Sequence, residues 1–270
     1  MSKIPKNLTQ IAFGIGSIDA NPELWDIMEY TRAEGYIPNI TINGTRMTQD
    51  DYDELASVCG AVAVSNYGKD LCYNAVQKLN EAMERIPNAT LRQVNIHQLL
   101  AKETLDTCWD LLKDVKEDKR LGGLNAAVFL LLKPKGKRNK LTQLRNGSLY
   151  RDMITYALDN KLRIGFDSCT APSFLRAIDG RHDYKRLAEM AEACESSCFS
   201  WYVDVDGVSW PCSFSAGEPE IEGINLLEID DFIKDVWNAP STVGFRDKLI
   251  KSHECHGCRR CPIWDLEIDK

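Results

Sequence analysis

Residues 11–45 read IAFGIGSIDANPELWDIMEYTRAEGYIPNITINGT, and this stretch decides the fold. It begins with a short apolar run, continues with apolar side chains at helical spacing after Asn21 and Pro22, and ends in a second apolar run after Gly35. Asn is a preferred helix N-cap, Pro is favoured at the first helical position, and Gly commonly ends a helix. The stretch therefore predicts a strand, a helix and a second strand in succession.

The same alternation continues along the chain. Apolar runs that predict strands recur at residues 10–14, 37–42, 60–65, 92–97, 126–132 and 162–166, with amphipathic helical segments between them. Repeated βα units specify an α/β fold with a parallel sheet, which is either open or closed into a barrel. Active sites in such sheets collect at the C-terminal ends of the strands.

Composition narrows the class of protein. The chain has 270 residues, of which 44% are hydrophobic and 27% charged, as in soluble globular proteins, and a net charge of −7, which argues against general nucleic-acid binding. No apolar run reaches the ~18–20 residues of a membrane span, and the N-terminus lacks the apolar core of a signal peptide. We therefore expect a cytoplasmic protein that does not span a membrane.

The pattern changes after about Asp179, so we predict a βα body over residues 1–180 and a cysteine-bearing cap over 181–270. The cap contains WYVDVDGVSWPC (201–212), in which Asp206 and Gly207 predict the turn of a β-hairpin. Short helices are expected near residues 183–193, 230–237 and 242–251.

Cysteine is the compositional outlier. We interpret Cys59, Cys72 and Cys108 as buried thiols that act as small apolar residues. In a reducing cytosol, clustered cysteines suggest metal ligation before disulfides. The spacing leaves open an iron–sulfur cluster or zinc, and four of the six clustered cysteines would suffice. These candidate metal ligands are Cys194, Cys198, Cys212, Cys255, Cys258 and Cys261.

Several segments together resemble the radical S-adenosylmethionine (radical SAM) enzymes that carry a C-terminal SPASM or twitch auxiliary-cluster domain. Residues 11–45 are similar to the second βα unit and third strand of that barrel, and VAVSNYG (62–68) to the end of the fourth strand. NIHQLL (95–100) resembles the fifth strand and NAAVFLLLKPKGK (125–137) the sixth. The family's auxiliary domain opens with a cysteine, nine to fifteen residues, a glycine, four residues and a cysteine. Cys194, Gly207 and Cys212 fit this motif.

One family feature is absent. The CxxxCxxC loop, which follows the first strand of the family and holds the SAM-cleaving cluster, is not found in this sequence. The resemblance therefore implies a partial barrel of the radical SAM type without its first strand, and the C-terminal part of an enzyme. We expect the missing segment upstream or on a second chain.

The resemblance also implies site residues. Over the barrel mouth, the candidates for SAM contacts are Gly14, Ile15, Gly16, Ser17, Asn43, Ser65, Asn66, Asn95 and His97. The alternatives are that Ser65 and Asn66 cap the following helix, and that His97 is structural. In the cap, the six cysteines would hold one auxiliary 4Fe–4S cluster, with zinc as the alternative. Cys169 is either a pocket residue or a spare cluster ligand.

Two functions remain open. The first is a radical SAM-type oxidoreductase or peptide or protein maturase, with a peptide or protein substrate and a reductant such as flavodoxin or ferredoxin. The second is a non-catalytic iron–sulfur or zinc protein that keeps the scaffold for binding or electron transfer. The basic run Lys133, Lys135, Lys137, Arg138 and Lys140 is either a solvated surface or a receptor for an acidic peptide.

Overall fold

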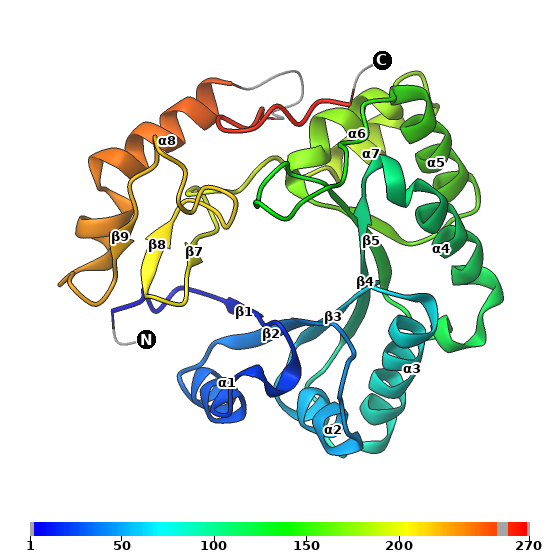
Figure 1. The fold of residues 1–270 in the computed structure, drawn as a ribbon, viewed down its shortest axis with the longest axis horizontal. Helices are drawn as coiled ribbons and strands as arrows, with labels where there is room; N and C mark the ends of the chain where they lie inside the picture. Colours follow the sequence, from blue (N-terminus) through cyan, green and yellow to red (C-terminus); the bar gives the residue numbers. More distant parts are fainter. Residues whose placement is uncertain (1–2, 253–258, 269–270) are drawn as a thin grey trace. The chain divides into compact units, whose positions relative to one another are not determined.

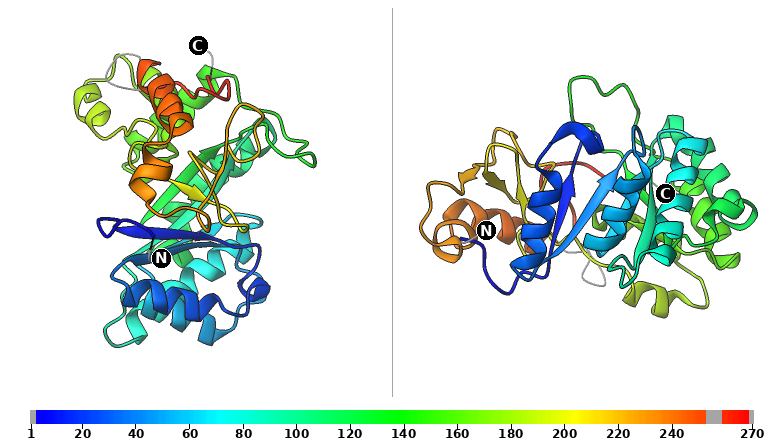
Figure 2. Two further views of the ribbon diagram at one scale, coloured as in Figure 1. Left: turned by 90° about the vertical axis from the view of Figure 1, so that its left-hand side faces the viewer. Right: turned by 90° about the horizontal axis from the view of Figure 1, so that it is seen from below.

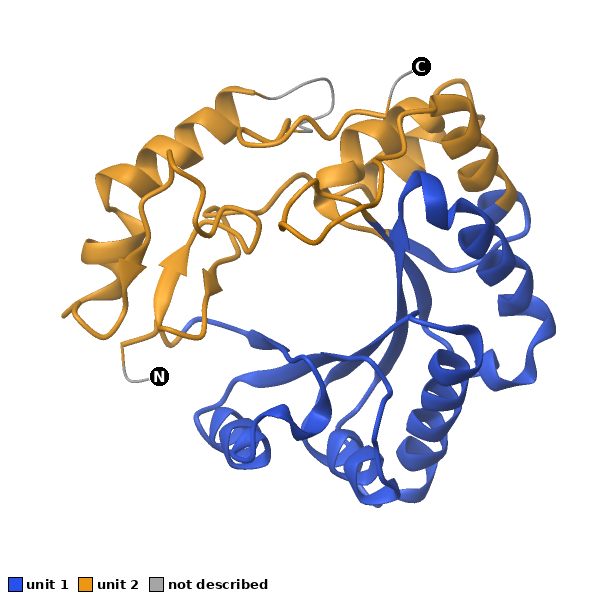
Figure 3. Ribbon diagram, in the orientation of Figure 1, with its two compact units in different colours: residues 1, 7–130, 157–165 blue, residues 2–6, 131–156, 166–270 orange. Residues whose placement is uncertain are grey.

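A computed structural model describes residues 3–252 and 259–268. The chain forms two compact units (Figure 3). Unit 1 comprises Asn7–Leu130 and Ala157–Gly165, and unit 2 is built mainly from Leu131–Tyr156 and the chain from Phe166 onward. Unit 2 therefore takes residues from both sides of position 180, and the boundary between residues 1–180 and 181–270 remains a prediction.

A six-stranded sheet in the order β1-β2-β3-β4-β5-β6 confirms the α/β class (Figure 1). Its strands are Gln10–Gly14, Ile37–Ile42, Ala61–Ser65, Gln93–Leu100, Ala126–Leu131 and Ile164–Phe166. β1 to β4 pair in parallel. The connecting helices are α1 (Leu24–Ala33), α2 (Gln49–Val58), α3 (Lys69–Arg85), α4 (Leu105–Glu117) and α5 (Gly147–Asp159). Short helical turns lie at η1 (Ile18–Ala20), η2 (Lys102–Thr104), η3 (Lys119–Leu121) and η4 (Ser168–Thr170).

Two boundaries differ from the sequence prediction. β4 continues to Leu100, so His97 lies inside the strand and not at its end. α1 begins at Leu24, two residues later than Pro22 suggests, because the side chain of Asn21 accepts a hydrogen bond from the backbone N–H of Glu23 at 2.9 Å. That bond closes a local turn, which competes with helix geometry.

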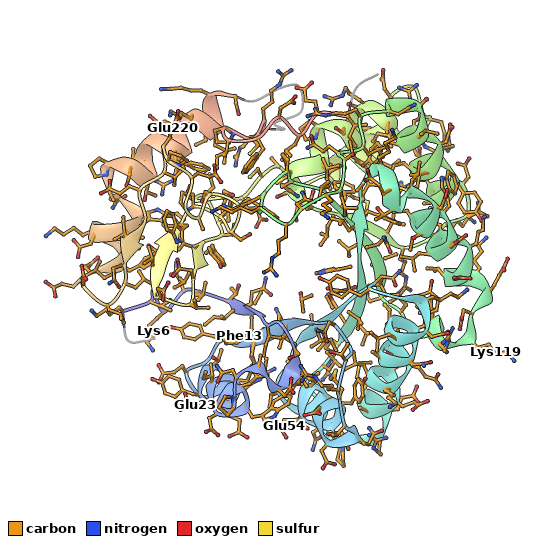
Figure 4. All side chains as sticks on the ribbon, in the orientation of Figure 1. Lys6, Phe13, Glu23, Glu54, Lys119 and Glu220 are labelled. Carbon is orange, nitrogen blue, oxygen red and sulfur yellow. The ribbon has the colours of Figure 1, made fainter. Side chains whose placement is uncertain are left out.

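The two faces of the sheet in unit 1 have opposite character. The register aligns Phe13, Ile40, Val62 and Val94 in one row across β1 to β4, and the last three of these are buried. α1 to α4 cover this face (Figure 1), and Phe13 is marked on β1 in Figure 4. Each fully buried aliphatic side chain contributes about 1.5–3 kcal/mol, so this face is the main source of stability in unit 1.

The opposite face is lined by small and polar side chains. Gly14, Thr41, Ala63 and Asn95 form a row in register, and none of them is large enough to build a core there. β1 ends the strand order and has β2 as its partner (Figure 2). Its side chains alternate between exposed and half-buried, so β1 has the burial pattern of an edge strand.

Unit 2 contains a small antiparallel sheet in the order β7-β8-β9, with strands Tyr202–Val203, Val208–Trp210 and Ile224–Asn225. β7 and β8 are the predicted hairpin, and Gly207 adopts a φ of 78° in its turn, a conformation that favours glycine. The helices of this unit after β6 are α6 (Ala171–Ala177), α7 (Tyr184–Glu189), η5 (Ile233–Trp237) and α8 (Pro240–Lys251). In the described part of the chain, no helix combines the length and apolar character that crossing a membrane requires.

Candidate functional site

The predicted SAM-contact residues of unit 1 lie at adjacent positions on the sheet. Ser65 pairs with His97, and Asn43 directly follows Ile42, which pairs with Val64 beside Ser65. Asn95 lies two residues before His97 in β4 and therefore on the same face of the sheet. Asn43 and Ser65 thus mark the carboxyl ends of β2 and β3, and His97 and Asn95 lie inside β4 at neighbouring register positions.

The loop after β1 is fastened to the loop after β2. Asn43 donates from Nδ2 to the carbonyl of Gly16 at 2.5 Å, and Arg46 donates to the Ser17 hydroxyl at 3.0 Å. Ser17 in turn donates to Asp19 at 2.6 Å, and this hydrogen bond together with Arg46 lowers the pKa of Asp19. The segment Gly14, Ile15, Gly16 and Ser17 is thus held in place by side chains of the neighbouring strand's loop.

Ser65 and Asn66 do not cap the helix that follows them. The N-cap of α3 is Gly68, with no side-chain hydrogen bond there. Asn66 donates to Gln98 at 2.7 Å, while its own Oδ1 atom is buried without a hydrogen-bond partner among the described residues. A buried acceptor without a partner costs about 1–3 kcal/mol, so this atom is suited to receive a ligand's donor.

The chemistry of this region is neutral and polar. Burial lowers the pKa of His97, so its imidazole is uncharged at pH 7. Asn95 accepts a hydrogen bond from Asn125 at 2.9 Å. Tyr67, which the sequence analysis did not single out, follows Asn66 and is 78% exposed. Amide, hydroxyl and imidazole groups beside an exposed ring can bind the hydroxyl groups and the flat base of a nucleoside.

The second candidate site is the group of thiols in unit 2. The interaction between the Cys169 and Cys194 thiols lowers the pKa of Cys194 and, together with burial, raises that of Cys169. Burial raises the pKa of Cys261, and the nearby charges of Cys194 and Cys212 raise it further. Cys255 and Cys258 lie outside the described residues. Within residues 3–252 and 259–268, no three Cys, His, Asp or Glu side chains are grouped so that they could hold a metal ion.

Cations surround these thiols. Arg259 donates to the carbonyl of Cys194 at 2.8 Å, and its charge helps lower the pKa of that thiol. Lys133, which is 6% exposed, is paired with Asp167, and its charge offsets only part of the rise in the Cys169 pKa that the Cys194 thiol and burial cause. Positive charge stabilises thiolates, which are the form of cysteine that binds metal. Thiols are the donors that iron–sulfur clusters and zinc take, but the described residues do not bring three of them into one metal-binding group.

The hairpin holds Cys212 by local hydrogen bonds. The backbone N–H of Cys212 donates to the hydroxyl of Ser215 at 3.0 Å, and the indole N–H of Trp210 donates to Asp204 at 2.8 Å.

By contrast Cys59, Cys72 and Cys108 are fully buried in unit 1, which confirms their interpretation as packing residues.

The basic run that follows β5 is partly structural. Lys133 pairs with Asp167, and Lys135 pairs with Glu218 at 3.2 Å and donates to the carbonyl of Phe214 at 2.9 Å. Lys137, Arg138 and Lys140 are exposed. The sequence treated these five cations as one surface, but two of them anchor the segment instead.

No protein-family model and no curated protein sequence matches the chain. Solved structures do share its fold. SuiB from Streptococcus suis aligns with a TM-score of 0.63 at 13% identity, over 95% of this chain and 67% of SuiB. SuiB bound to S-adenosylmethionine aligns with a TM-score of 0.65 at 14% identity, over 92% of this chain and 59% of SuiB.

A second protein, anSMEcpe, has the same fold. Its hexahistidine-tagged form with bound AdoMet aligns with a TM-score of 0.58 at 17% identity, over 97% of this chain and 74% of anSMEcpe. Native anSMEcpe with bound AdoMet and the Cp18Cys peptide gives a TM-score of 0.55 at 16% identity, over 87% and 69% of the two chains. This chain thus spans between 59% and 74% of the length of these four structures.

Proposed function

We propose that this chain belongs to a radical SAM-type iron–sulfur enzyme that modifies a peptide or protein. One observation carries the proposal: the fold is shared with structures that hold S-adenosylmethionine, and Asn43 and Ser65 lie at the carboxyl ends of β2 and β3, with His97 of β4 as the register partner of Ser65. Sheets of this kind bind ligands at that edge. The peptide substrate follows by analogy with anSMEcpe, which was solved with a bound peptide.

In this proposal unit 1 binds and orients SAM. The fastened loop Gly14–Ser17 faces the methionyl part, Asn43, Ser65 and Asn95 bind hydroxyl groups, and the orphaned Oδ1 atom of Asn66 accepts a donor from the ligand. Because burial lowers its pKa, His97 is neutral and can donate or accept a hydrogen bond without adding a charge to the site. When bound to its own reduced cluster, SAM supplies a radical that abstracts hydrogen from the substrate.

The SAM-cleaving cluster needs the CxxxCxxC motif, which this sequence does not contain. We therefore propose that another segment or a second chain supplies it. Unit 2 would hold an auxiliary 4Fe–4S cluster by thiols from the set Cys194, Cys198, Cys212, Cys255, Cys258 and Cys261. Flavodoxin or ferredoxin would deliver the electrons.

Anaerobic purification and titration calorimetry test both halves of this proposal. The chain reconstituted with iron and sulfide should be brown and hold about four iron atoms. It should also bind SAM, and the substitutions Ser65→Ala and Asn66→Ala should each weaken that binding. Glu23→Ala, at an exposed position on the helix side, is the matched control (Figure 4). A colourless protein with stoichiometric zinc and no SAM binding would contradict the proposal.

The missing CxxxCxxC motif favours a second candidate, a non-catalytic scaffold that binds metal or transfers electrons. The two candidate functions predict different effects of a partner protein that carries CxxxCxxC. If co-expression with a neighbouring gene product that carries CxxxCxxC restores SAM cleavage, this chain is part of an enzyme. A metal-loaded chain for which no such partner restores SAM cleavage supports the scaffold.

A further inference from the structure

We propose that a cavity in unit 2 binds a carboxylate with an apolar body, which is either a free organic acid or the carboxyl end of a peptide. The cavity has a volume of about 300 Å³, at the lower end of the range for small-molecule sites. Its lining comes from residues within 169–176 and from the segment 259–267, and both belong to unit 2. The inference does not depend on the proposed function, because it uses neither SAM nor a metal.

Two hydrogen-bond donors in the lining lack an acceptor. The indole N–H of Trp264 is buried and has no partner among the described residues. Ser173 is 4% exposed, and its hydroxyl oxygen accepts from the backbone N–H of Ile268 at 3.2 Å and from Arg176 at 3.1 Å. Because both lone pairs are used, this hydroxyl can add only its own hydrogen, which no described residue accepts. A ligand that fits the cavity must therefore bring acceptors.

The lining also has a cation that no carboxylate neutralises. Its two acidic residues are already paired, Glu267 with Arg260 at 3.0 Å and Asp265 with Arg145 at 3.0 Å. Arg259 donates to a backbone carbonyl at 2.8 Å and forms no ion pair in the described part of the chain. A guanidinium carries five N–H donors in a planar fork that matches a carboxylate. The charge therefore favours an anionic acceptor over a neutral one.

The rest of the lining selects among anions. It is apolar and consists of Pro172, Pro262, Ile263, Leu266 and the ring of Trp264. Inorganic phosphate would leave this surface without a contact, whereas an acid with a hydrocarbon body would cover it and gain from the burial. One arginine without a carboxylate partner also matches a single negative charge. An apolar monocarboxylate fits all of these features.

The competing occupant is the proposed auxiliary cluster, because Cys169 and Cys261 line the same cavity. Two thiols do not complete a cluster site, and the described residues contain no group of three metal-binding side chains. We therefore assign the cavity to the acid, and the experiment below includes the cluster as an alternative.

The test measures binding to the full chain by titration calorimetry. The probes are 3-phenylpropionate, as the free acid, and an acetylated dipeptide that ends in phenylalanine, each compared with its neutral amide. We expect at least one acid to bind, and its amide to bind about tenfold more weakly or worse, because only a charged group gains the stronger hydrogen bonds. Preference for 3-phenylpropionate would identify a small-molecule site, and preference for the dipeptide would identify a site for a peptide end. If neither acid binds, if the amides bind equally well, or if inorganic phosphate binds as tightly, the proposal is overturned.

Two variants locate the site. Trp264→Phe keeps an apolar ring and removes only the N–H, and Arg259→Gln removes the charge, so each should weaken the acid about tenfold. The matched controls are Trp25→Phe on α1 of unit 1 and Arg138→Gln at an exposed position, and both should bind like the wild type. Equal losses in variants and controls would place the acid elsewhere and overturn the assignment. The comparison of acid with amide uses the wild type alone, so it stands even if a variant fails to fold.

A final titration repeats the measurement after reconstitution with iron and sulfide. We expect the affinity for the acid to be unchanged. Loss of acid binding on iron uptake would assign the cavity to the cluster, which overturns this inference and leaves the proposed function intact. A chain that takes up no iron and still binds the acid would support the inference and contradict the proposed cluster.

Discussion

At the scale of single residues, burial separates two classes of thiol. Burial raises the pKa of Cys59, Cys72 and Cys108 to about 12, so at pH 8 about one molecule in ten thousand carries the reactive thiolate at each position. We expect iodoacetamide at pH 8 to leave these three residues unmodified in the native protein and to label them in urea. Peptide mass spectrometry measures the difference, and native labelling of Cys72 would contradict it.

His97 gives the folded state a pH dependence. Its pKa lies below that of an exposed histidine, about 6.5, because burial disfavours the charged form. The unfolded chain therefore binds a proton more readily, so the contribution of His97 to stability is present above pH 6.5 and is lost as the pH falls. Between pH 7.5 and 5.5, His97→Gln should lose less stability than the wild type, as judged from urea midpoints. Equal losses would contradict this expectation.

Local sequence predicted some of these residues and missed others. The fully buried thiols were predictable because Cys72 and Cys108 occupy the apolar stripes of amphipathic helices. The interaction between the Cys169 and Cys194 thiols was not predictable, because only tertiary folding brings the turn after β6 near a residue beyond α7. Tyr67 was missed for a similar reason: nothing in a sequence marks one tyrosine as exposed at a strand end.

At the scale of elements, an ion pair joins Lys133, two residues after β5, to Asp167, the residue after β6. Asp167 accepts hydrogen bonds from Lys133, from the Thr170 hydroxyl and from the backbone N–H of Leu131. Removing one partner of a buried pair leaves the other charge uncompensated, at a cost of about 3 kcal/mol. Asp167→Asn should reduce the free energy of unfolding of the metal-free protein by about that amount in urea titrations.

The control for this prediction is Asp247→Asn. Asp247 forms an exposed pair with Lys251 on α8, at 3.7 Å, and such pairs contribute less than about 1 kcal/mol. If the two substitutions change stability equally, the buried pair has no special role.

The elements themselves were predictable to within a few residues, because helices and strands follow periods that can be read from single segments. The capping box of Thr48 and Asp51 marks the start of α2 and is present. Position 98 was harder to predict: Gln98 is polar, yet it is 2% exposed and accepts from Asn66, and so β4 continues past His97. A hydrophobic pattern cannot predict that a polar residue is buried because it has a specific hydrogen-bond partner.

At the scale of the molecule, we expect this chain alone to be inactive in SAM cleavage. The reason is chemical: none of its cysteine spacings provides the CxxxCxxC loop that leaves an open iron site for SAM. Reduced with dithionite and mixed with SAM, the chain should form no 5′-deoxyadenosine above background. Multiple turnovers, measured by chromatography, would show that another set of its cysteines holds the catalytic cluster.

The six-stranded α/β sheet was predictable from the sequence, but the composition of the two units was not. Leu131–Tyr156 belongs to unit 2 although it lies between strands of the sheet. Its assignment depends on contacts such as Lys135 with Glu218 and Arg145 with Asp265, which join residues far apart in the chain. Sequence periodicity carries no information about such pairs.

The interaction between the Cys169 and Cys194 thiols has a consequence for handling the protein in air. Two neighbouring thiols without metal can be oxidised by dioxygen to a disulfide, and the two electrons and two protons pass to dioxygen. That bond would close a loop through α6 and α7 and stabilise a colourless form by about 3 kcal/mol. We expect aerobic preparations to melt at a higher temperature and to bind no iron until dithiothreitol is added. Peptide mapping without reductant identifies the bond, and its absence after prolonged aeration would show that the two sulfurs do not meet.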